Sequence, residues 1–572
     1  MKTIIASALA LFLCAGLAAQ SRIDTRTRAY VSPKRIVWKY DGEDGSLVKN
    51  ADVLLKEGIG QAGTAIPEVC TMRSTSNQTP AILLDYGKEL QGGIQLVNSQ
   101  LSTKGIKVRI RFGESASEAM ADIGEKGATN DHAMRDFIVT LPMMGVIEVG
   151  NSGFRFVRID LIDHNSVLAL QEASAIFTYH DIPRIGSFKS NDERLNQIWD
   201  TGAYTVHLNM QEYLWDGIKR DRLVWQGDLY PEVMTVSAVF GYHEVVPNSL
   251  DYGVKTDPLP KWMNGFSAYS LWWLMNQRDW YYNHGDLDYL KKNRDYILEL
   301  IDQVISKIDG NGVEKLDGAR FLDWPTSENA EVVHAGLQAL MVMTMNGCID
   351  ICNALNEKAA AEKCRNAVQL LRKHIPDALN NKQAASLLSL AGMRDAGEMN
   401  TIVARNGAEG FSTFYGYFML QAMAKAGDYQ GAIDCIRNYW GGMLDLGATS
   451  FWEDFDMEWL KNAGRIDELV PEGKVDVHGD YGKYCYLGFR HSLCHGWASG
   501  PTAWLSRHVL GVEVVEPGCK TVRIIPNLGD LQWVEGTFPT PKGAIRIRHE
   551  KQADGRIVSK IDAPRGIKVI KR

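Results

Sequence analysis

Apolar and polar positions alternate most regularly in the first third of the chain. Residues 107–112, KVRIRF, place a branched or aromatic side chain at every second position, which is the period of a strand with one buried and one wet face. Similar runs rich in branched and aromatic residues occupy 81–86, 94–97 and 154–161, with glycines and short polar clusters between them. Because no helical stretch separates these strands, we expect an antiparallel β-sandwich over residues 21–187.

The period changes near residue 187. Pro183 and Gly186 end the last strand of the β region. Residues 190–193, Ser-Asn-Asp-Glu, have the composition of a helix N-terminus, and Glu193 stands at capping-box distance from Ser190. Apolar residues at 195, 198, 203 and 206 follow near helical spacing. A helical domain is therefore predicted to begin at residue 188.

Helical spacing then continues to residue 510. Apolar positions between residues 290 and 308 form one stripe of an amphipathic helix, whereas 332–355 is nearly free of charge, as in a helix buried on several sides. Residues 358–374 and 414–425 continue the series on short connections. Alternation of amphipathic and buried helices predicts a double-walled α barrel over 188–510. An α-solenoid would show a similar pattern, but we find no repeat at a fixed period.

Short alternating strands return after Gly511. They occupy 520–525, 544–549, 556–561 and 567–570, and Gly, Pro and Asp turns separate them. Residues 511–572 are therefore predicted to form a small closing β domain.

The first 20 residues have the pattern of a secretory signal peptide. Lys2 gives a positive start, residues 4–17 are almost wholly apolar, and Ala18-Ala19-Gln20 places small residues at the expected cleavage point. Cys14 follows the bulky Leu13, which disfavours a lipoprotein. Later segments lack the 18 or more unbroken apolar residues that span a bilayer. We expect an exported protein, periplasmic or secreted, that does not insert into a membrane after cleavage.

Composition narrows the classes of function. The chain has 572 residues, 45% of them hydrophobic, and a net charge of −7 from 62 basic and 69 acidic side chains. Such a balance produces no field that attracts nucleic acid or an anionic membrane. The eight cysteines beyond residue 20 are widely spread and form no paired CxxC motifs. We interpret them as small buried hydrophobic residues, with neither a metal nor a cofactor implied.

Charge and aromatic residues concentrate in residues 215–228, WDGIKRDRLVWQGD. The stretch carries three carboxylates, three basic side chains and two tryptophans. A solvated face, a structural ion-pair corner and a site for a polar ligand all fit these residue types. Two tryptophans and two glycines argue against a plain solvated helix. Carboxylates with pKa values separated by arginines and apolar walls perform acid–base chemistry near neutral pH, and tryptophan suits the C–H face of a sugar ring.

Two further clusters lie downstream. Residues 447–456, GATSFWEDFD, offer Glu453 beside Trp452, although a helix N-terminus enriched in acidic residues would look the same. Residues 491–497, HSLCHGW, contain His495, and a lone histidine near apolar residues is usually a core residue. Trp324 is equally plausible as a stacking platform or a core residue. The same ambiguity holds for Trp262, Trp272 and Trp273, which we leave outside the predicted site.

The three clusters, in this order, resemble bacterial α-L-rhamnosidases of glycoside hydrolase family 78, a six-hairpin glycosidase type. Asp-x-x-x-Arg-Asp-Arg-Leu-x-Trp-x-Gly-Asp resembles the family signature, GATSFWE the segment of its general base, and Ser-Leu-x-His a segment that contacts the sugar. Residues 150–161 and the C-terminal tail also resemble the flanking β domains. The resemblance implies an N-terminal antiparallel β-sandwich, a central (α/α)6 barrel and a small C-terminal β domain. It implies removal of terminal α-L-rhamnose from glycans or glycosides with inversion.

The resemblance also assigns roles. Asp221 falls at the position of the general acid and Glu453 at that of the base, and the sugar is held by Asp216, Arg220, Trp225, Asp228 and His495. The family usually has glutamate at the acid position, so the aspartate here is one methylene shorter. Either the backbone moves inward to compensate, or another carboxylate donates the proton. The other candidates are Asp228, Glu232, Asp323 and Glu328.

Two other functions remain open at this point. One is a different (α/α)6 glycosidase or lyase that acts on another sugar, such as an unsaturated uronide. The other is a catalytically silent glycan-binding protein that keeps the aromatic pocket, which the glutamate-to-aspartate change favours.

Overall fold

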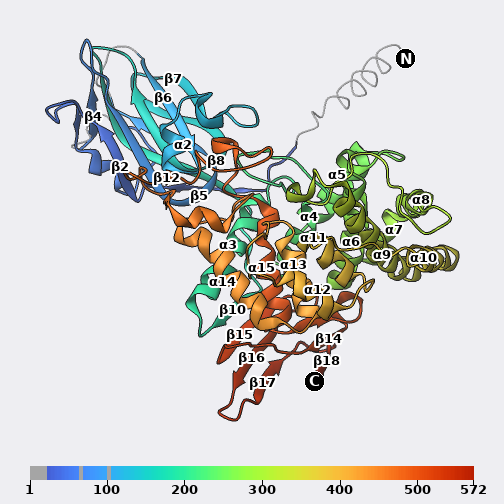
Figure 1. Cartoon of the computed structure of the whole chain (residues 1–572). Helices are drawn as coiled ribbons and strands as arrows, with labels where there is room; N and C mark the ends of the chain where they lie inside the picture. The colour runs from blue at the N-terminus through green and yellow to red at the C-terminus, as the bar shows by residue number, and fades with distance from the viewer. Residues whose placement is uncertain (1–21, 64–67, 100–104, 572) are drawn as a thin grey trace, which may run out of the picture.

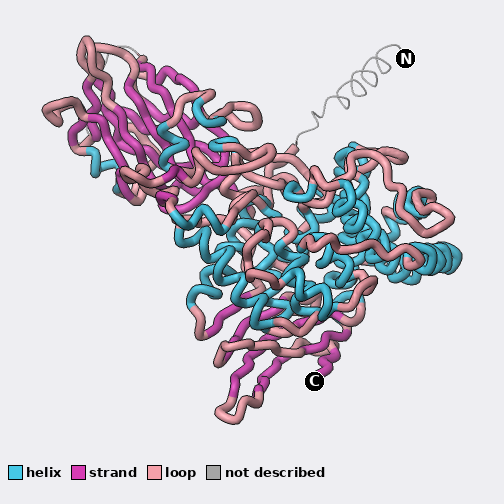
Figure 2. The backbone as a smooth tube through the Cα atoms, viewed as in Figure 1, coloured by secondary structure: helices cyan, strands magenta, loops and turns pink. Residues whose placement is uncertain are grey.

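The computed structural model describes residues 22–63, 68–99 and 105–571, so the predicted signal peptide, residues 1–20, lies outside the described part. A β domain stands at one end of the molecule, helices fill the centre, and a second region of strands closes the opposite end (Figures 1 and 2). The order along the chain is that predicted from the hydrophobic pattern.

The N-terminal domain is antiparallel, as predicted. Its strands run in the order β3-β4-β9-β5-β8-β6-β7, with β1 on β9 and β2 on β5, as one hydrogen-bonded sheet. Their bounds are β1 Thr27–Val31, β2 Arg35–Tyr40, β3 Val48–Lys49, β4 Cys70–Arg73, β5 Ala81–Asn98, β6 Ile106–Gly113, β7 Asp136–Leu141, β8 Gly145–Leu161 and β9 Val167–Tyr179. Inward-facing residues such as Val108, Ile110 and Phe154 form its core.

A bulge interrupts the pairing of β5 with β8. The register runs from Gly92 opposite Ser152 to Ile94 opposite Val149, so Gly93 alone faces two residues of β8, Gly150 and Asn151. A Cβ on Gly93 would lie 2.4 Å from the Val149 carbonyl oxygen, which is why glycine stands there. The bulge frees Asn151 from the ladder.

The helical domain is the predicted double-walled barrel. Six helices form a closed ring in which each contacts the next: α4 Leu229–Val239, α6 Ser267–His284, α9 Ala330–Ala354, α11 Lys382–Leu390, α13 Gly416–Lys425 and α15 Gly500–Trp504. Outside the ring, α3 Glu193–Asn209, α8 Arg294–Ile305, α10 Lys358–Leu371, α12 Ala396–Val403 and α14 Tyr429–Asp445 pack against its members. The helices α5 Val245–Thr256 and α7 Leu287–Lys292 complete the region.

The apolar composition of helix α9 is explained by its burial inside the protein. Among the described helices it is the one long and apolar enough to cross a membrane by length and composition alone. However, 72% of its most apolar window is buried inside the protein. It is one of the six ring helices and contacts α6, α10 and α11, so its apolar residues face neighbouring helices.

Two local predictions differ from the structure. The residue that caps α3 is Asp192, whose carboxylate accepts the N–H groups of Arg194 and Leu195, while Ser190 belongs to a strand. The stripe between residues 290 and 308 is split at Asn293 into α7 and α8. Asparagine competes for backbone hydrogen bonds and so favours a break that apolar spacing alone does not reveal.

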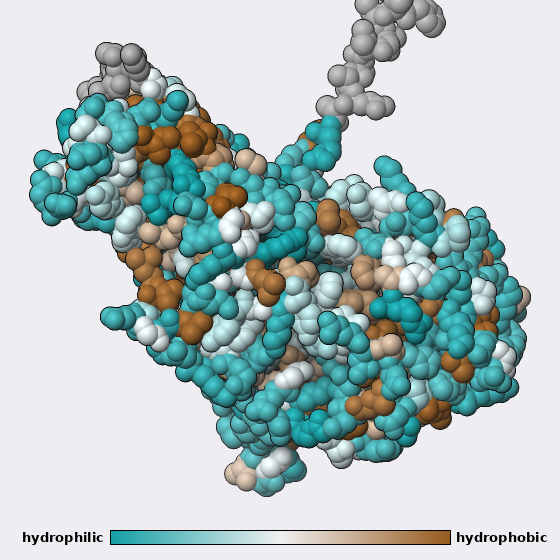
Figure 3. Space-filling view, turned by 45° about the horizontal axis from the view of Figure 1, so that its top comes forward, coloured by the Kyte–Doolittle hydropathy of each residue, from teal (hydrophilic) through white to brown (hydrophobic). Residues whose placement is uncertain are grey.

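The C-terminal domain closes the end of the barrel away from the β domain (Figure 1). Its strands form two small sheets, β10-β15-β16-β17 and β13-β14-β18. The bounds are β10 Ser187–Ser190, β13 Val512–Val514, β14 Thr521–Ile524, β15 Trp533–Phe538, β16 Ile545–Lys551, β17 Ile557–Asp562 and β18 Lys568–Lys571. Since β10 pairs with β15, the expected boundary at 187/188 falls inside a strand of the closing sheet. The face of the molecule seen in Figure 3 is mainly hydrophilic, with separate hydrophobic patches.

Candidate active site

The charged stretch at 215–228 forms a tight loop between α3 and α4. The Asp216 carboxylate closes this loop, because it accepts the N–H of Asp221 at 3.0 Å and that of Leu223 at 2.9 Å. Gly217 permits the closure, since a Cβ there would lie 2.3 Å from the Arg220 carbonyl oxygen. Gly217 also bridges to His495, which brings the third sequence cluster to the first.

Arg220 joins the first cluster to the second. Its Nη1 donates to Asp221 Oδ1 at 2.7 Å, and its Nη2 donates to Glu453 Oε1 and Oε2 at 2.9 and 2.7 Å. Its Nε donates to the carbonyl oxygen of Arg490 at 2.7 Å, and the residue is only 4% exposed. Burial lowers the pKa of this guanidinium, but the neighbouring charges, those of Glu453 and Asp221 foremost, together raise it above its ordinary value, so Arg220 stays charged. One cation therefore holds two carboxylates that are more than 200 residues apart in sequence.

Glu453 itself lies in an irregular stretch, whereas the helix N-terminus offered as the alternative is found at the end of the segment, where Asp456 caps a short 3-10 helix, Met457–Lys461. The segment pairs with the third cluster, since the Glu453 N–H donates to the Ser492 carbonyl at 2.9 Å. The Ser492 N–H in turn donates to Glu453 Oε2 at 3.2 Å. The carboxylate thus has a fixed position between Arg220 and the 491–497 segment.

His495 lies between two carboxylates. Its Nε2 is 3.3 Å from Asp228 Oδ2, its Nδ1 is 3.9 Å from Glu453 Oε1, and Tyr269 donates to the other Asp228 oxygen at 2.8 Å. Burial lowers the pKa of this imidazole, but Glu453 and Asp228 together raise it above its ordinary value. His495 therefore lines the pocket between two carboxyl groups, and the core-residue alternative does not describe it.

Burial raises the pKa of the remaining carboxylates. It raises the pKa of Asp216 to about 7, with contributions from the neighbouring charges of Asp221 and Asp228. Burial likewise raises the pKa of Asp228. The site thus combines buried carboxyl groups whose pKa values are raised with two further carboxyl groups that lie against the Arg220 guanidinium. Unequal surroundings of this kind are the usual basis of acid–base chemistry.

All seven predicted site residues line one pocket with about 410 Å³ of open space. Its walls are largely aromatic: Trp225, Phe266, Tyr269, Phe321, Trp324 and Trp497. Trp324 thus has the position of a stacking platform, while Trp272 and Trp273 are fully buried core residues. The three sequence clusters do converge on a single cavity, although the roles of the residues stay predictions.

Of the carboxyl groups considered as proton donors, two line the pocket and three do not. Glu232 is fully buried behind Gly496, outside the pocket lining, and neither of its oxygens meets a hydrogen-bond donor among the described residues. Asp323 is enclosed by Ser412, Gln383 and the Trp324 N–H, and Glu328 lies on the surface. Asp221 and Asp228 line the pocket, and the Asp221 side chain is the more open, at 19% against 4%.

The β domain supports the loop at 215–228 from outside the barrel. The Lys219 ammonium lies 3.0 Å from Glu114 Oε2 and 3.1 Å from Glu118 Oε1, and all three side chains are buried. His132, from the loop before β7, places Nδ1 3.4 Å from Asp221 Oδ1. Sequence reasoning missed these residues because no local motif marks them. The pocket aromatics Phe266, Tyr269 and Phe321 likewise carry no motif of their own.

Two groups of side chains have the spacing of metal ligands. They are Asp216, Asp228 and His495 in the pocket, and Glu114, Glu118 and His478 beneath the β domain. In the second group the Lys219 ammonium lies within 3.1 Å of both glutamates, and in the first the His495 Nε2 lies 3.3 Å from Asp228. The eight cysteines in the described part of the chain are free, and all but Cys485 are buried, as interpreted from the sequence.

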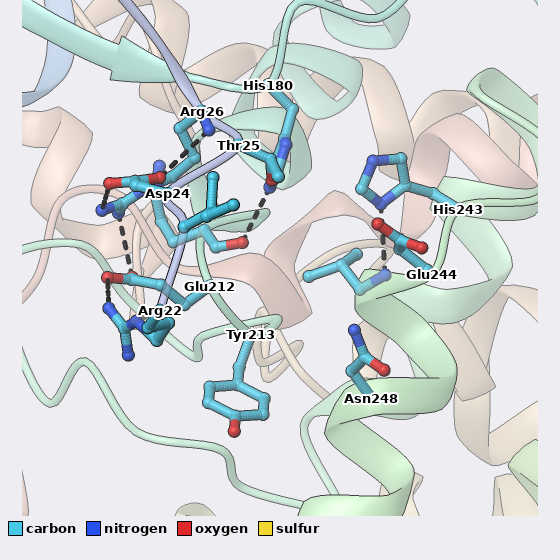
Figure 4. Close-up of a pocket in the computed structure, with 13 residues that line it drawn as sticks. Arg22, Asp24, Thr25, Arg26, His180, Glu212, Tyr213, His243, Glu244 and Asn248 are labelled. Atoms are coloured by element: carbon cyan, nitrogen blue, oxygen red, sulfur yellow. Dashed lines mark hydrogen bonds and ion pairs between the residues drawn. The ribbon is translucent and has the colours of Figure 1, made fainter. Parts of the chain in front are cut away.

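A second pocket lies where residues 22–26 cross the ends of β9 and α3 and the start of α5 (Figure 4). It has about 630 Å³ of open space, more than the first. Its charges are paired with one another: Arg22 and Arg26 both contact Glu212, and Arg26 also binds Asp24. His180 and His243 face each other with ring centres 4.8 Å apart.

Comparison with known proteins agrees with this architecture. Residues 183–404 match the family described as bacterial alpha-L-rhamnosidase 6 hairpin glycosidase domain, and residues 511–570 match the bacterial alpha-L-rhamnosidase C-terminal domain. A curated alpha-L-rhamnosidase of Alteromonas sp. (strain LOR) is 23% identical over 537 residues, covering 84% of this chain and 54% of that protein. The chain thus spans about half the length of the curated relative that it matches.

Solved structures show the same fold. The GH78 family rhamnosidase of Bacillus sp. GL1 superposes with a TM-score of 0.73 at 20% identity, over 89% of this chain and 54% of that one. The rhamnosidase from Klebsiella oxytoca with rhamnose bound gives 0.66 at 17% identity, over 85% and 96% of the two chains. Residues 183–404 and 511–570 therefore match the six-hairpin and C-terminal domains of the bacterial α-L-rhamnosidase family.

Proposed function

We propose that this protein is an exported glycoside hydrolase that removes terminal α-L-rhamnose from glycans or glycosides with inversion at the anomeric carbon. The observation that carries the proposal is the placement of Asp221 and Glu453 on one buried guanidinium, that of Arg220, in a pocket walled by aromatic rings. An inverting glycosidase needs two carboxyl groups that face one sugar from opposite sides.

In this reaction Asp221 acts as the general acid. Its proton passes to the glycosidic oxygen as the bond from that oxygen to the anomeric carbon breaks. A water molecule gives its proton to Glu453 and forms the new bond on the opposite face. Free rhamnose and the aglycone alcohol are the products. Arg220 donates to both oxygens of Glu453, and His495 Nδ1 lies 3.9 Å from Glu453 Oε1, so this carboxylate is held in one position for its role as the base.

The remaining residues hold the sugar. Trp225 and the neighbouring aromatic rings offer flat apolar surfaces to the C–H face of rhamnose. Asp228, fixed by Tyr269 and His495, presents carboxyl oxygens to sugar hydroxyl groups. Asp216 holds the backbone N–H of residue 221 in the closed loop, which supports the reading that local backbone position compensates for the shorter acid side chain.

The first test is the stereochemistry of hydrolysis. We expect the protein to cleave 4-nitrophenyl α-L-rhamnopyranoside, with β-L-rhamnose as the first product seen by proton NMR. An α-anomer as the first product contradicts inversion. Cleavage of an unsaturated disaccharide in place of the rhamnoside supports the lyase or uronide-hydrolase alternative. Rhamnose binding without turnover, unchanged in Glu453→Gln, supports a silent glycan-binding protein.

Export has its own test. Residues 1–20 have the signal-peptide pattern given above. We expect the protein recovered from the periplasm or the medium to begin at residue 21. An uncleaved N-terminus on protein recovered from the cytoplasm contradicts export.

A further inference from the structure

We propose that an open pocket on the β domain, beside Asp221, binds the leaving group, and that it selects a flat apolar aglycone such as a phenolic ring system. We refer to it as the aglycone pocket, formed mainly by His132, Met134, Phe137, Val149, Asn151 and Arg222. The inference rests on the proposed function, since it names the part of the substrate beyond the bond that is cleaved.

The aglycone pocket adjoins the proposed proton donor. His132 lines the pocket and also lies 3.4 Å from Asp221 Oδ1, and Arg222, which follows Asp221 in the chain, lines the pocket too. The general acid must meet the glycosidic oxygen, so the aglycone begins at Asp221 and extends away from the sugar pocket. The aglycone pocket is the cavity next to Asp221 on the β-domain side.

The walls of this pocket are mainly apolar. Met134 is 54% exposed, and Phe137 and Val149 are only partly buried, so hydrophobic surface remains open to solvent. Phe137 is supported from beneath by Phe112, with ring centres 5.9 Å apart. Hydrophobic surface of this kind, next to a polar site, is characteristic of binding surfaces.

The charged groups in the lining already have protein partners. The Asp131 carboxylate lies 3.3 Å from Arg490 and 3.4 Å from His132, whose Nδ1 also faces Asp221. Arg222 donates to the Asn151 carbonyl at 2.7 Å and to Asn151 Oδ1 at 3.1 Å, and it lies over the Trp215 ring at 4.8 Å. Asn151 is available for this because the bulge in β8 removes it from the ladder. A second sugar needs several free hydrogen-bond partners, whereas a flat apolar group needs mainly contact area. The lining therefore favours the apolar aglycone.

The loop that carries His132 and Met134 is held in place. Arg135, buried at its end, donates to the carbonyl oxygens of Phe112, Glu118 and Ala121. Asn130 accepts the N–H groups of Arg135 and Asp136, at 2.9 and 3.1 Å. A fixed loop places the pocket wall before substrate arrives, which reduces the entropy lost on binding.

The test compares phenyl and 2-naphthyl α-L-rhamnosides, whose leaving groups have similar acidity. We expect kcat/KM to be at least ~10-fold higher for the naphthyl compound, the scale of filling an apolar subsite. Met134→Asp is expected to bring the ratio of the two values close to one. Met143→Asp, at a 43% exposed methionine in the turn after β7, is the matched control and should leave the ratio unchanged.

Three results overturn the inference: equal kcat/KM values for the two compounds in the wild-type protein, no change of the ratio in Met134→Asp, or a preference for a rhamnosyl disaccharide with a sugar aglycone. Calorimetric titration with 2-naphthol separates this failure from that of the proposed function, because it needs no turnover. We expect saturable binding that Met134→Asp weakens at least ~5-fold. Absence of saturable binding also overturns the inference, whereas binding without rhamnoside hydrolysis contradicts only the proposed function.

Discussion

The two charged pockets of this protein differ in how their charges are balanced. In the pocket of Figure 4, Arg22 and Arg26 meet Glu212 and Asp24 near the surface, and these ion pairs satisfy one another in contact with water. In the candidate active site, the carboxyl groups of Asp216, Asp221, Asp228 and Glu453 outnumber the cations, and most of them are buried.

This comparison shows that the volume of a cavity is a poor guide to chemistry. The larger pocket has paired charges and ordinary surface exposure, so it offers little that a reaction could use. The smaller pocket has more carboxyl groups than cations and largely aromatic walls. Burial there raises the pKa of Asp216 and that of Asp228. Each of the following predictions sets one residue of the candidate active site against a matched residue elsewhere.

The largest effect is expected from the central cation. Arg220→Gln leaves the Glu453 carboxylate buried without its partner, so we expect it to lower the free energy of unfolding by about 3–5 kcal/mol. Arg22→Gln, in the second pocket, removes an exposed pair and should cost less than ~1 kcal/mol. Thermal unfolding midpoints of the two variants check this. Equal shifts contradict the distinction between the pockets.

The proposed acid and base come next. Asp221→Asn and Glu453→Gln should each lower kcat for the nitrophenyl rhamnoside at least ~100-fold, the scale of removing a positioned acid or base. Glu212→Gln serves as the control carboxylate and should change kcat less than ~2-fold, because Glu212 touches only the second pocket. Near-normal activity in Asp221→Asn would transfer the acid role to another carboxyl group, with Asp228 the remaining candidate in the lining.

The pH dependence of stability should have opposite signs in the two regions. Burial raises the pKa of Asp323, near the active site, from 3.8 to about 6, so the folded state keeps a proton that the unfolded chain releases. The contribution of Asp323 to the free energy of unfolding is therefore fully present below about pH 4 and is lost as the pH rises toward 6. Asp323→Asn should remove that loss, on the order of 1–3 kcal/mol.

In the second pocket, Arg26 lowers the pKa of Asp24 to about 2, so its contribution is present above pH 4 and is lost as pH falls toward 2. Unfolding free energies measured across pH 2–8 for Asp323→Asn and Asp24→Asn distinguish the two signs. A wild-type slope between pH 4 and 6 that Asp323→Asn leaves unaltered contradicts the assignment.

The smallest effect is expected from the residue that the β domain adds to the site. His132→Ala removes a contact 3.4 Å from the Asp221 carboxylate and should lower kcat/KM by about 2- to 10-fold, the scale of one hydrogen bond. His243→Ala, in the second pocket, is the control and should leave kcat/KM unchanged. No difference between the two variants implies that His132 plays no part in positioning the acid.

Much of this organisation could be predicted from the chain, since the signals involved are local. Strand alternation, helical stripes and the residues of the three clusters are readable within short windows, and these residues do line one pocket. Order along the chain, together with resemblance to a known family, linked Asp221 with Glu453. Local patterns also carried errors, as at Asn293, where one stripe concealed two helices.

What could not be predicted depends on contacts between distant segments. The pairing of β10 with β15 joins residues about 350 positions apart, and nothing in either strand specifies the other. Lys219 was visible as one charge among several, but its burial with Glu114 and Glu118 required the β domain to be placed. His132 and the aglycone pocket depend on the same placement, because a loop of the β domain meets the barrel there.

The most direct test of the central claim is the structure of the protein with L-rhamnose bound. The account predicts one rhamnose in the pocket of Trp225 and Trp324, with the Asp221 and Glu453 carboxyl groups on opposite sides of its anomeric carbon, about 6.5–9.5 Å apart. Rhamnose bound elsewhere, such as in the pocket of Figure 4, or a sugar that contacts only one of the two carboxyl groups, would contradict it.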